Sequence, residues 1–305
     1  MAKKALLVGV NAYLPPSISS LKGCVNDVQQ MRGVLQESYG FEPERIRLLV
    51  DKDATRQGIL DGLDWLVEGA QPGDVLVFHY SGHGSHVADD NDEEFDCEDE
   101  ILVTHDHDWS RPLRDDHIKH KFLPVPLEAN LTFICDSCHA GTINKLATEN
   151  EVPRSVLLPD EEQQKIAVKV ARRNAEYKAY TLERYREMAR TLTPDELDAA
   201  MDQFLAETLN QFKQNRYQFV DTRENNVLLA ACQAQQTSVE TLVAGDWHGA
   251  LTYNLVKAIV QAGAALTYQD LITRAAEGML QQRQVPQLEC PDRLKALPIF
   301  SPFVS

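Results

Sequence analysis

Residues 131–142, LTFICDSCHAGT, join a short apolar run to a cluster of reactive side chains. The run LTFIC has the length and apolar character of a strand buried on both faces of a sheet. Asp136, Ser137, Cys138 and His139 follow it directly. Cys138 is therefore a nucleophile, a metal ligand or one more buried thiol, and the segments on either side of it bear on the choice.

Comparable apolar runs recur along the chain, at residues 4–10, 46–50, 75–80 and 226–232. Segments with apolar residues at helical spacing separate or follow them, at residues 24–40, 54–74 and 249–261 and from Thr267 onward. Alternation of strands and helices predicts an α/β fold: a central, mainly parallel sheet with helices on both faces and right-handed crossovers.

Residues 150–217 have a different character, being long and charged with few strand formers. Thr193, Pro194 and Glu196 form a helix-start signature there, with proline at the first helical position. We expect one α/β domain in two parts, residues 1–149 and 223–305, separated by a helical insertion and linker at 150–222.

The overall composition narrows the class of partner. The 305 residues carry a formal charge of −16, which argues against nucleic acid as a partner and suits a basic peptide or a cation. No apolar run approaches the roughly 18 residues of a membrane span, so we expect no membrane association. The start MAKKALLVGVNAY lacks a cleavage site, and the six cysteines form no disulfide framework, so we expect a cytoplasmic protein.

A second strand end carries chemistry as well. The run at 75–80 leads into HYSGHG, which places His83 between Gly82 and Gly84. Functional groups gather beyond the carboxyl ends of parallel strands, so His83 and Cys138 are expected on the same edge of the sheet. An imidazole beside a thiol activates it as a nucleophile. The backbone N–H groups of Cys138 and Gly84 are the expected donors to the oxyanion.

Each of these residues also has a structural interpretation, as a buried thiol and as a loop histidine. His79, His86 and His139 are rival bases. His79 precedes the strand end and should point into a face of the sheet. His139 directly follows Cys138, which makes good geometry for proton transfer difficult, and we favour His83.

HYSGHG and DSCHAG together resemble the paired signatures of metacaspases and bacterial caspase homologues, which are caspase-fold cysteine peptidases of clan CD, family C14. His83 precedes Cys138 by 55 positions (138 minus 83), close to the spacing of about 50 typical of caspases. The resemblance extends to LKGCVNDVQQM (21–31), CQAQQTSVE (232–240), GALTYNLVKAI (249–259) and QVPQL (284–288). It covers residues 3–145 and 225–290 and leaves the insertion outside.

The resemblance implies a caspase-like fold and a cysteine endopeptidase that cleaves after Arg or Lys. The family's specificity pocket corresponds here to Cys24, Asp27, Ser81 and Asp136. Two carboxylates at the base of a pocket pair with a guanidinium and repel an acidic side chain. The structural alternatives are a solvated helix residue for Asp27 and a turn cap for Asp136.

The family's calcium region corresponds to the acidic segment 89–100 and to Asp115 and Asp116, with Asp99, Asp115 and Asp116 as ligands. The fourth family acid corresponds to Asn144 or Lys145, and an ammonium there would oppose a cation. A second departure is Ala234, where many relatives carry an acid. We expect no required cofactor, with calcium as a candidate activator.

Several alternatives stay open. Cys97, His105, His107, His117 and His120 lack the tight paired spacing of a zinc site, and we interpret the histidines as partly exposed loop residues. Three functions therefore stay open for the chain: a monomeric peptidase, a caspase-fold scaffold without catalytic activity, or a metal-dependent hydrolase built on residues 89–120. Candidate self-cleavage sites in the insertion are Arg154, Lys165, Lys169, Arg172 and Arg173, with the region of Pro153 and Arg154 least hindered by helical structure.

Overall fold

A computed structural model describes residues 1–91, 97–138, 150–214, 226–232, 236, 238–282 and 284–303. These residues form two compact units. The larger unit contains residues 1–85, 100–157 and 218–305, and the smaller contains 86–99 and 158–217. Each unit is described by itself.

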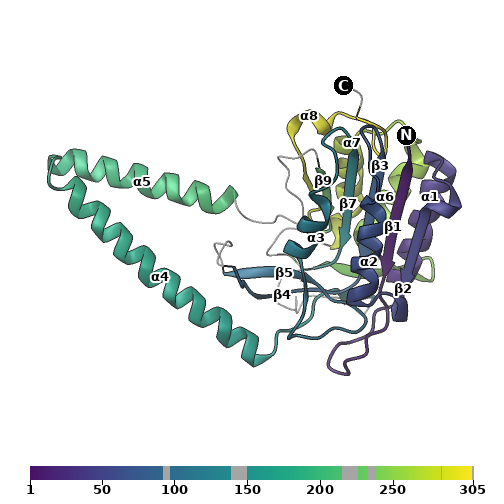
Figure 1. Ribbon diagram of the computed structural model, residues 1–305, viewed down its shortest axis with the longest axis horizontal. Coiled ribbons are helices and arrows are strands. Elements are labelled where there is room, and N and C mark those ends of the chain that lie inside the picture. The colour runs from purple at the N-terminus through teal and green to yellow at the C-terminus, as the bar shows by residue number, and fades with distance from the viewer. Residues whose placement is uncertain are drawn as a thin grey trace. The chain divides into compact units, whose positions relative to one another are not determined.

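A six-stranded sheet with the order β12-β9-β7-β3-β1-β2 forms the centre of the larger unit (Figure 1). Its strands are β1 (Lys3–Gly9), β2 (Ile46–Val50), β3 (Val75–Ser81), β7 (Asn130–Asp136), β9 (Asn226–Ala230) and β12 (Gln287–Glu289). All neighbours pair in parallel except β12, which runs antiparallel to β9. Every residue of β3 and β7 is buried, as continuous apolar runs at the centre of a parallel sheet require.

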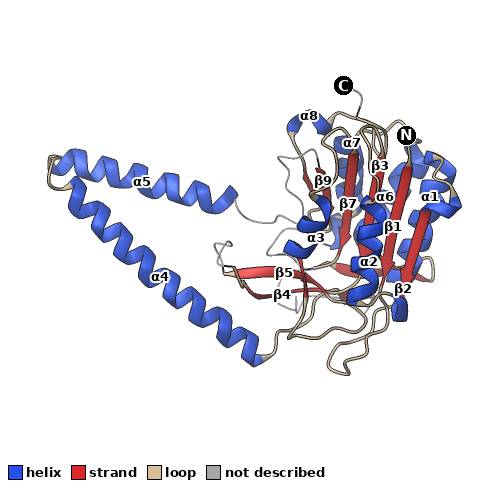
Figure 2. Cartoon of the chain, in the orientation of Figure 1, coloured by secondary structure: helices blue, strands red, loops and turns tan. Residues whose placement is uncertain are grey.

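Helices cover both faces of this sheet (Figure 2). Side chains from α1 (Cys24–Tyr39), α6 (Ala250–Ala262), α7 (Tyr268–Gly278) and α8 (Asp292–Lys295) share one core cluster. Side chains from α2 (Arg56–Val67) and α3 (Asp115–Phe122) share the other. Ala5 and Leu7 belong to the first cluster and Leu6 and Val8 to the second, because successive strand residues point to opposite faces. The predicted α/β fold with a mainly parallel sheet and helices on both faces is confirmed.

Local signals set the helix ends. Gly40 ends α1 in the left-handed region, with φ 67°, and its N–H reaches the last carbonyls of the helix. Thr55 accepts from the N–H of Gly58 at the start of α2. Thr267 and Asp270 form a reciprocal capping box at the start of α7. Short 3₁₀ segments occupy Pro43–Arg45, Asp51–Asp53 and Leu280–Gln282.

Two small sheets complete the strand inventory of the described residues. One has the order β11-β10-β8 and is antiparallel, with β8 at Glu151–Pro153, β10 at Val239–Val243 and β11 at Asp246–Gly249. The other has the order β4-β5-β6, with β4 at Gly84–Ala88, β5 at Glu98–Leu102 and β6 at Leu113–Arg114.

The smaller unit contains two long helices, α4 (Asp160–Met188) and α5 (Pro194–Gln214). Glu196 accepts from the backbone N–H and the hydroxyl of Thr193 at the start of α5, which is the helix start expected there. The helices do not begin at residue 150. Residues 151–153 form a strand and residues 150–157 belong to the larger unit, because this stretch pairs with the edge of β10. Among the described residues, no helix combines the length and apolar character that crossing a bilayer needs.

Candidate active site

The predicted dyad residues follow neighbouring strands at the same edge of the sheet. Ser81 at the end of β3 pairs with Asp136 at the end of β7, and His83 and Cys138 each lie two residues further on. Both side chains are fully buried. The parallel register therefore places both predicted residues just beyond adjacent strand ends, at the same edge of the sheet.

His83 is oriented by backbone and ring contacts. Its Nε2 lies 2.8 Å from the carbonyl oxygen of Ser19, and its backbone N–H donates to the hydroxyl of Tyr13 at 2.8 Å. The rings of Tyr13 and His83 pack with centroids 5.0 Å apart. Burial lowers the pKa of His83 to about 4, against opposing contributions from the backbone of Ser19 and of Arg154. The imidazole is therefore neutral at neutral pH, the form that accepts a proton.

Both predicted oxyanion donors converge on one carbonyl group, that of Arg154. The N–H of Gly84 lies 3.0 Å from this oxygen and the N–H of Cys138 lies 3.3 Å from it. A carbonyl held between these two donors is positioned as the scissile carbonyl of an acyl-transfer reaction would be. The arrangement therefore holds the carbonyl of Arg154 at the edge of the sheet where the predicted dyad residues lie.

The thiol of Cys138 has a neighbour that the sequence did not predict. Its Sγ lies 3.2 Å from the carbonyl oxygen of Gln236, and the Sγ of Cys232 lies 3.2 Å from the same oxygen. The hydrogen bond to Cys138, followed by burial, raises the pKa of Cys232 well above its usual range. Cys232 therefore stays a neutral thiol beside the candidate nucleophile.

The guanidinium of Arg154 fills the predicted acidic pocket. Its Nη2 lies 2.7 Å from Oδ2 of Asp27, and its Nη1 lies 3.2 Å from Oδ1 of Asp136. Nη1 also donates to the hydroxyl of Ser81 at 2.8 Å and to the backbone carbonyl of Asp136 at 3.0 Å. Arg154 is 0% exposed, although it is the largest fully buried side chain among the described residues. An arginine buried this deeply needs carboxylate partners, and the pocket supplies them.

A third acid, Glu240 of β10, lies 3.9 Å from Nη2 of Arg154. Its carboxylate accepts from the backbone N–H groups of Lys22 and Gly23 and is 0% exposed. The sequence stretch CQAQQTSVE contains Glu240, but nothing in its local pattern marked it as a pocket residue.

Cys24, the fourth predicted pocket residue, is also buried, and burial raises the pKa of its thiol while the charge of Arg154 opposes this.

Burial raises the pKa values of the Asp27 and Asp136 carboxyls, and the charge of Arg154 lowers them. Burial raises the pKa of Asp27, but the charge of Arg154, the nearby His248 ring and a hydrogen bond from Ser81 bring it below its usual value. Burial dominates at Asp136 and raises its pKa, with the charge of Asp27 adding to the effect and that of Arg154 opposing it. The backbone also holds both carboxylates: the N–H of Gly249 lies 3.0 Å from Asp27, and that of Thr252 lies 2.7 Å from Asp136.

The chain on either side of Arg154 is extended and bonded to the larger unit. Before it, β8 pairs with β10, and the N–H of Arg154 donates to the carbonyl of Ser238 at 2.8 Å. After it, the N–H of Val156 donates to the carbonyl of Gly84 at 3.2 Å, and the hydroxyl of Ser85 donates to the carbonyl of Val156 at 3.0 Å. Residues 151–156 therefore lie as an added strand, which is how extended peptides bind to sheet edges.

The three expected calcium ligands are divided between the two units: Asp99 belongs to the smaller unit, and Asp115 and Asp116 belong to the larger unit. In the smaller unit, Asp99 forms with Asp89 and Asp90 a group whose carboxylate oxygens lie within 4.8 Å of one another. Such oxygens suit a hard cation. In the larger unit, Lys119 lies 2.7 Å from Asp115 and 3.2 Å from Asp116, and burial raises the pKa of Asp115 to about 6. The calcium site stays a prediction.

Within the described part of the chain, the histidines considered for zinc do not gather into a group that could hold a metal. The group whose ligand atoms lie close enough there is the acidic triplet of Asp89, Asp90 and Asp99. The expectation of partial exposure is wrong for His107, which is 5% exposed and packs edge-on against Trp109, with a pKa that burial lowers to about 4. The expectation of a loop is wrong for His117 and His120, which lie within α3. His79 is buried as expected, and its Nε2 lies 3.0 Å from the hydroxyl of Thr252 on α6. His139, Asn144, Lys145 and Ala234 lie outside the described residues.

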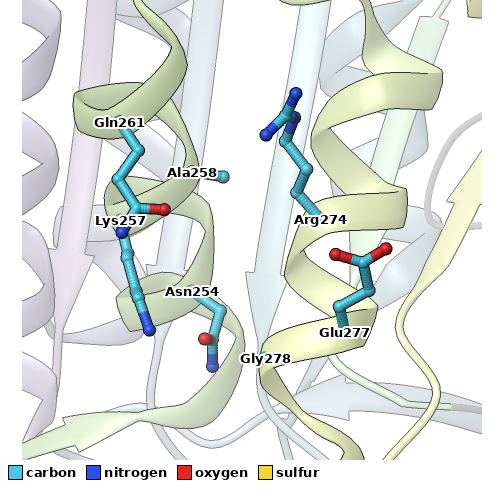
Figure 3. Close-up of a pocket in the computed structure, with 7 residues that line it drawn as sticks. All are labelled: Asn254, Lys257, Ala258, Gln261, Arg274, Glu277 and Gly278. Atoms are coloured by element: carbon cyan, nitrogen blue, oxygen red, sulfur yellow. The ribbon is translucent and has the colours of Figure 1, made fainter.

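A separate groove of about 250 Å³ lies between α6 and α7 (Figure 3). Its walls come from Asn254, Lys257, Ala258, Gln261, Arg274, Glu277 and Gly278. None of the dyad, oxyanion or pocket residues lines it. The groove is therefore separate from the candidate active site.

Comparison with known proteins agrees with this geometry. The profile of the "Metacaspase, peptidase C14 domain" family matches residues 3–147. Metacaspase-1 of Schizosaccharomyces pombe is 31% identical over 94% of this chain, which covers 67% of that protein. Metacaspase-6 of Arabidopsis thaliana is 42% identical over 49% of this chain and 41% of its own length.

Solved structures share the fold. A crystal structure of a Geobacter sulfurreducens protein has a TM-score of 0.64 at 22% identity and covers the whole of both chains. Caspase-1 of Spodoptera frugiperda has a TM-score of 0.52 at 11% identity and covers 99% of this chain and 91% of its own. The architecture is therefore the caspase-like fold.

Alignments to several other fungal metacaspases span only about a third of those proteins' own length, 32% in Cryptococcus neoformans. The match to the fission-yeast protein, in contrast, extends over nearly the whole of this chain, on both sides of the insertion. Taken with the paired strand ends and the caspase-like sheet, it shows that the chain belongs to the metacaspase family of C14 peptidases.

Proposed function

We propose that this protein is a cysteine endopeptidase that hydrolyses peptide bonds after arginine or lysine, with Cys138 as nucleophile and His83 as proton carrier. The observation that carries the proposal is the pose of Arg154. Its guanidinium meets Asp27 and Asp136 while its carbonyl accepts from Gly84 and Cys138. This is the pose that a substrate arginine requires.

In the proposed reaction, the sulfur of Cys138 attacks the carbonyl carbon of the arginine, and His83 takes up the thiol proton. The N–H groups of Gly84 and Cys138 stabilise the negative oxygen of the tetrahedral intermediate. His83 then gives the proton to the leaving amine, which breaks the C–N bond and leaves a thioester on Cys138. Water, deprotonated by His83, hydrolyses the thioester and restores the thiol.

The pocket favours a guanidinium for a geometric reason. Its two terminal nitrogens reach separate carboxylates, Asp27 from Nη2 and Asp136 from Nη1. A lysine ammonium is a single point charge and reaches fewer of these partners at once. An aspartate side chain would meet like charges in a desolvated pocket, so cleavage after Asp is disfavoured. We therefore expect arginine to be the better of the two basic residues.

The bond between Arg154 and Ser155 is the protein's own first substrate in this proposal. The other candidate sites, Lys165, Lys169, Arg172 and Arg173, lie within α4, where a helical backbone cannot lie extended in the cleft. Until Arg154 leaves the pocket it competes with other substrates at the high effective concentration of a tethered group. The uncut chain is thus a zymogen that basic peptides or proteins cannot enter freely.

Matched fluorogenic peptides that end in Arg, Lys or Asp test the proposal. The wild type and Cys138→Ala are each assayed with calcium and with a chelator. Hydrolysis after Arg and Lys, absent from the variant, is the expected result, and loss in chelator would add calcium as an activator. Hydrolysis after Asp would refute the pocket assignment. No turnover by the folded, uncut chain is expected while Arg154 fills the pocket. No turnover by a folded wild type already cut after Arg154 would leave a caspase-fold binding module as the better description.

A further inference from the structure

We propose that Ser85 and the main chain of Gly84 form a binding subsite for the second residue after the cleaved bond. The proposal rests on the function proposed above and adds a requirement on the substrate. The peptide must continue for at least two residues beyond its arginine, so the preferred substrates are extended internal segments of proteins.

Gly84 contacts the bound strand on both sides of the Arg154–Ser155 bond. Its N–H donates to the carbonyl of Arg154 at 3.0 Å, and its carbonyl accepts from the N–H of Val156 at 3.2 Å. These two bonds make Gly84 and Ser155 a parallel bridge pair. Gly84 therefore contacts both Arg154, whose carbonyl oxygen becomes the oxyanion, and Val156, which belongs to the segment released by cleavage.

Ser85 adds a side-chain contact one residue further along. Its hydroxyl donates to the carbonyl of Val156 at 3.0 Å. Ser85 is 0% exposed and Val156 is 9% exposed, so water does not replace this bond easily. The contact is made to a backbone carbonyl, so it selects for the presence of a second residue and not for its side chain.

The two contacts couple binding to chemistry. The N–H of Gly84 is an oxyanion donor, and the carbonyl of the same residue is held by the N–H of the second residue after the bond. A substrate that fills this subsite fixes Gly84 in the position that the tetrahedral intermediate needs. Binding energy from a part of the substrate that does not react is used in this way to position the catalytic groups.

Two substrates that share Glu-Val-Pro-Arg, the sequence of residues 151–154, test the proposal. One carries aminomethylcoumarin directly after the arginine and has nothing to place in the subsite. The other is a donor–quencher peptide that continues with Ser-Val as residues 155 and 156 do. The full-length wild type and Ser85→Ala are compared on both, after mass spectrometry has verified that their processing states match.

We expect Ser85→Ala to lower kcat/KM on the continuing peptide roughly 3- to 10-fold, the effect of one buried hydrogen bond. Its kcat/KM on the coumarin substrate should match the wild type. Equal losses on both substrates would overturn the proposal, because they would indicate a structural role for Ser85. Unchanged values on both would overturn it too.

A substrate-side test avoids any change to the enzyme. The wild type is given the continuing peptide with an N-methyl group on the valine, which removes the N–H that Gly84 accepts. We expect a loss of similar size in kcat/KM, and equal rates for the two peptides would overturn the role of Gly84. If the wild type hydrolyses neither the coumarin nor the continuing peptide, the proposed function fails first and the subsite falls with it.

Discussion

Truncating Arg154 to alanine removes the cation that compensates the pocket acids. Asp27, Asp136 and Glu240 are each 0% exposed, and all three lie within 4.0 Å of its guanidinium. Removing one partner of a buried ion pair costs about 3–5 kcal/mol, because the remaining charge stays buried without compensation. We expect Arg154→Ala to lose about 3 kcal/mol of unfolding free energy at pH 8.

The loss should depend on pH with a defined sign. In the wild type, Arg154 helps to hold the pKa of Asp27 below its unfolded value, so this carboxyl stabilises the fold above about pH 4 and the contribution is lost as pH falls through the folded pKa. Without Arg154, we expect burial, the largest influence on this carboxyl, to raise the folded pKa of Asp27 above the unfolded one. Stability then falls as pH rises between the two values. The variant should therefore approach the wild type near pH 5 and diverge from it toward pH 8.

Urea unfolding at pH 5, 6.5 and 8, in a Cys138→Ala background that prevents self-cleavage, measures this difference. Arg172→Ala is the matched control, because Arg172 is an exposed arginine on α4 whose Nε lies 3.7 Å from a carboxylate oxygen of the exposed Glu176. It should change stability by less than about 0.5 kcal/mol at every pH. A pH-independent Arg154→Ala loss, or one that is larger at pH 5, would refute the reasoning.

Three further predictions concern the pocket and the base. A Cβ at Gly249 would overlap the Asp136 carboxylate and the Arg154 guanidinium, so Gly249→Ala should abolish arginine hydrolysis in a folded protein. The control Gly33→Ala has open space at its Cβ and should leave the hydrolysis rate unchanged. Retained activity in Gly249→Ala would contradict the pocket geometry. Asp27→Asn should lower kcat/KM on arginine peptides by about 10- to 100-fold, because a charge-assisted hydrogen bond to the guanidinium is lost. An unchanged preference for Arg over Asp peptides in this variant would contradict the role of Asp27. His83 should stay neutral down to about pH 4 in uncut Cys138→Ala; a midpoint near its ordinary value of about 6.5, measured by NMR titration, would contradict the buried geometry.

The parts of the fold that the sequence predicted depend on local patterns. Continuous apolar runs predicted β3 and β7, and the parallel register then aligned Ser81 with Asp136, which brings the residues two positions beyond each strand to one edge. The signature at Thr193, Pro194 and Glu196 predicted the start of α5 for the same local reason. The strands and the helix start need only neighbours in sequence, whereas the shared edge was inferred from the alternation of strands and helices along the chain.

The parts that were missed depend on contacts between distant segments. Arg154 is a candidate self-cleavage site in the sequence, but its stretch is predicted to be helix and linker, and its position in the pocket follows from the pairing of β8 with β10. Glu240 joins the pocket through the same strand pairing. Ser19 orients His83 through a backbone carbonyl, which leaves no side-chain signature in the sequence. No local pattern encodes any of these contacts.

The most direct test is intact-mass spectrometry of the purified full-length protein during incubation, with Cys138→Ala in parallel. The wild type should convert to two fragments, residues 1–154 and 155–305, while the variant stays whole. A first cut at another bond, or cleavage at Arg154 that persists without the Cys138 thiol, would contradict the assignment of pocket and nucleophile.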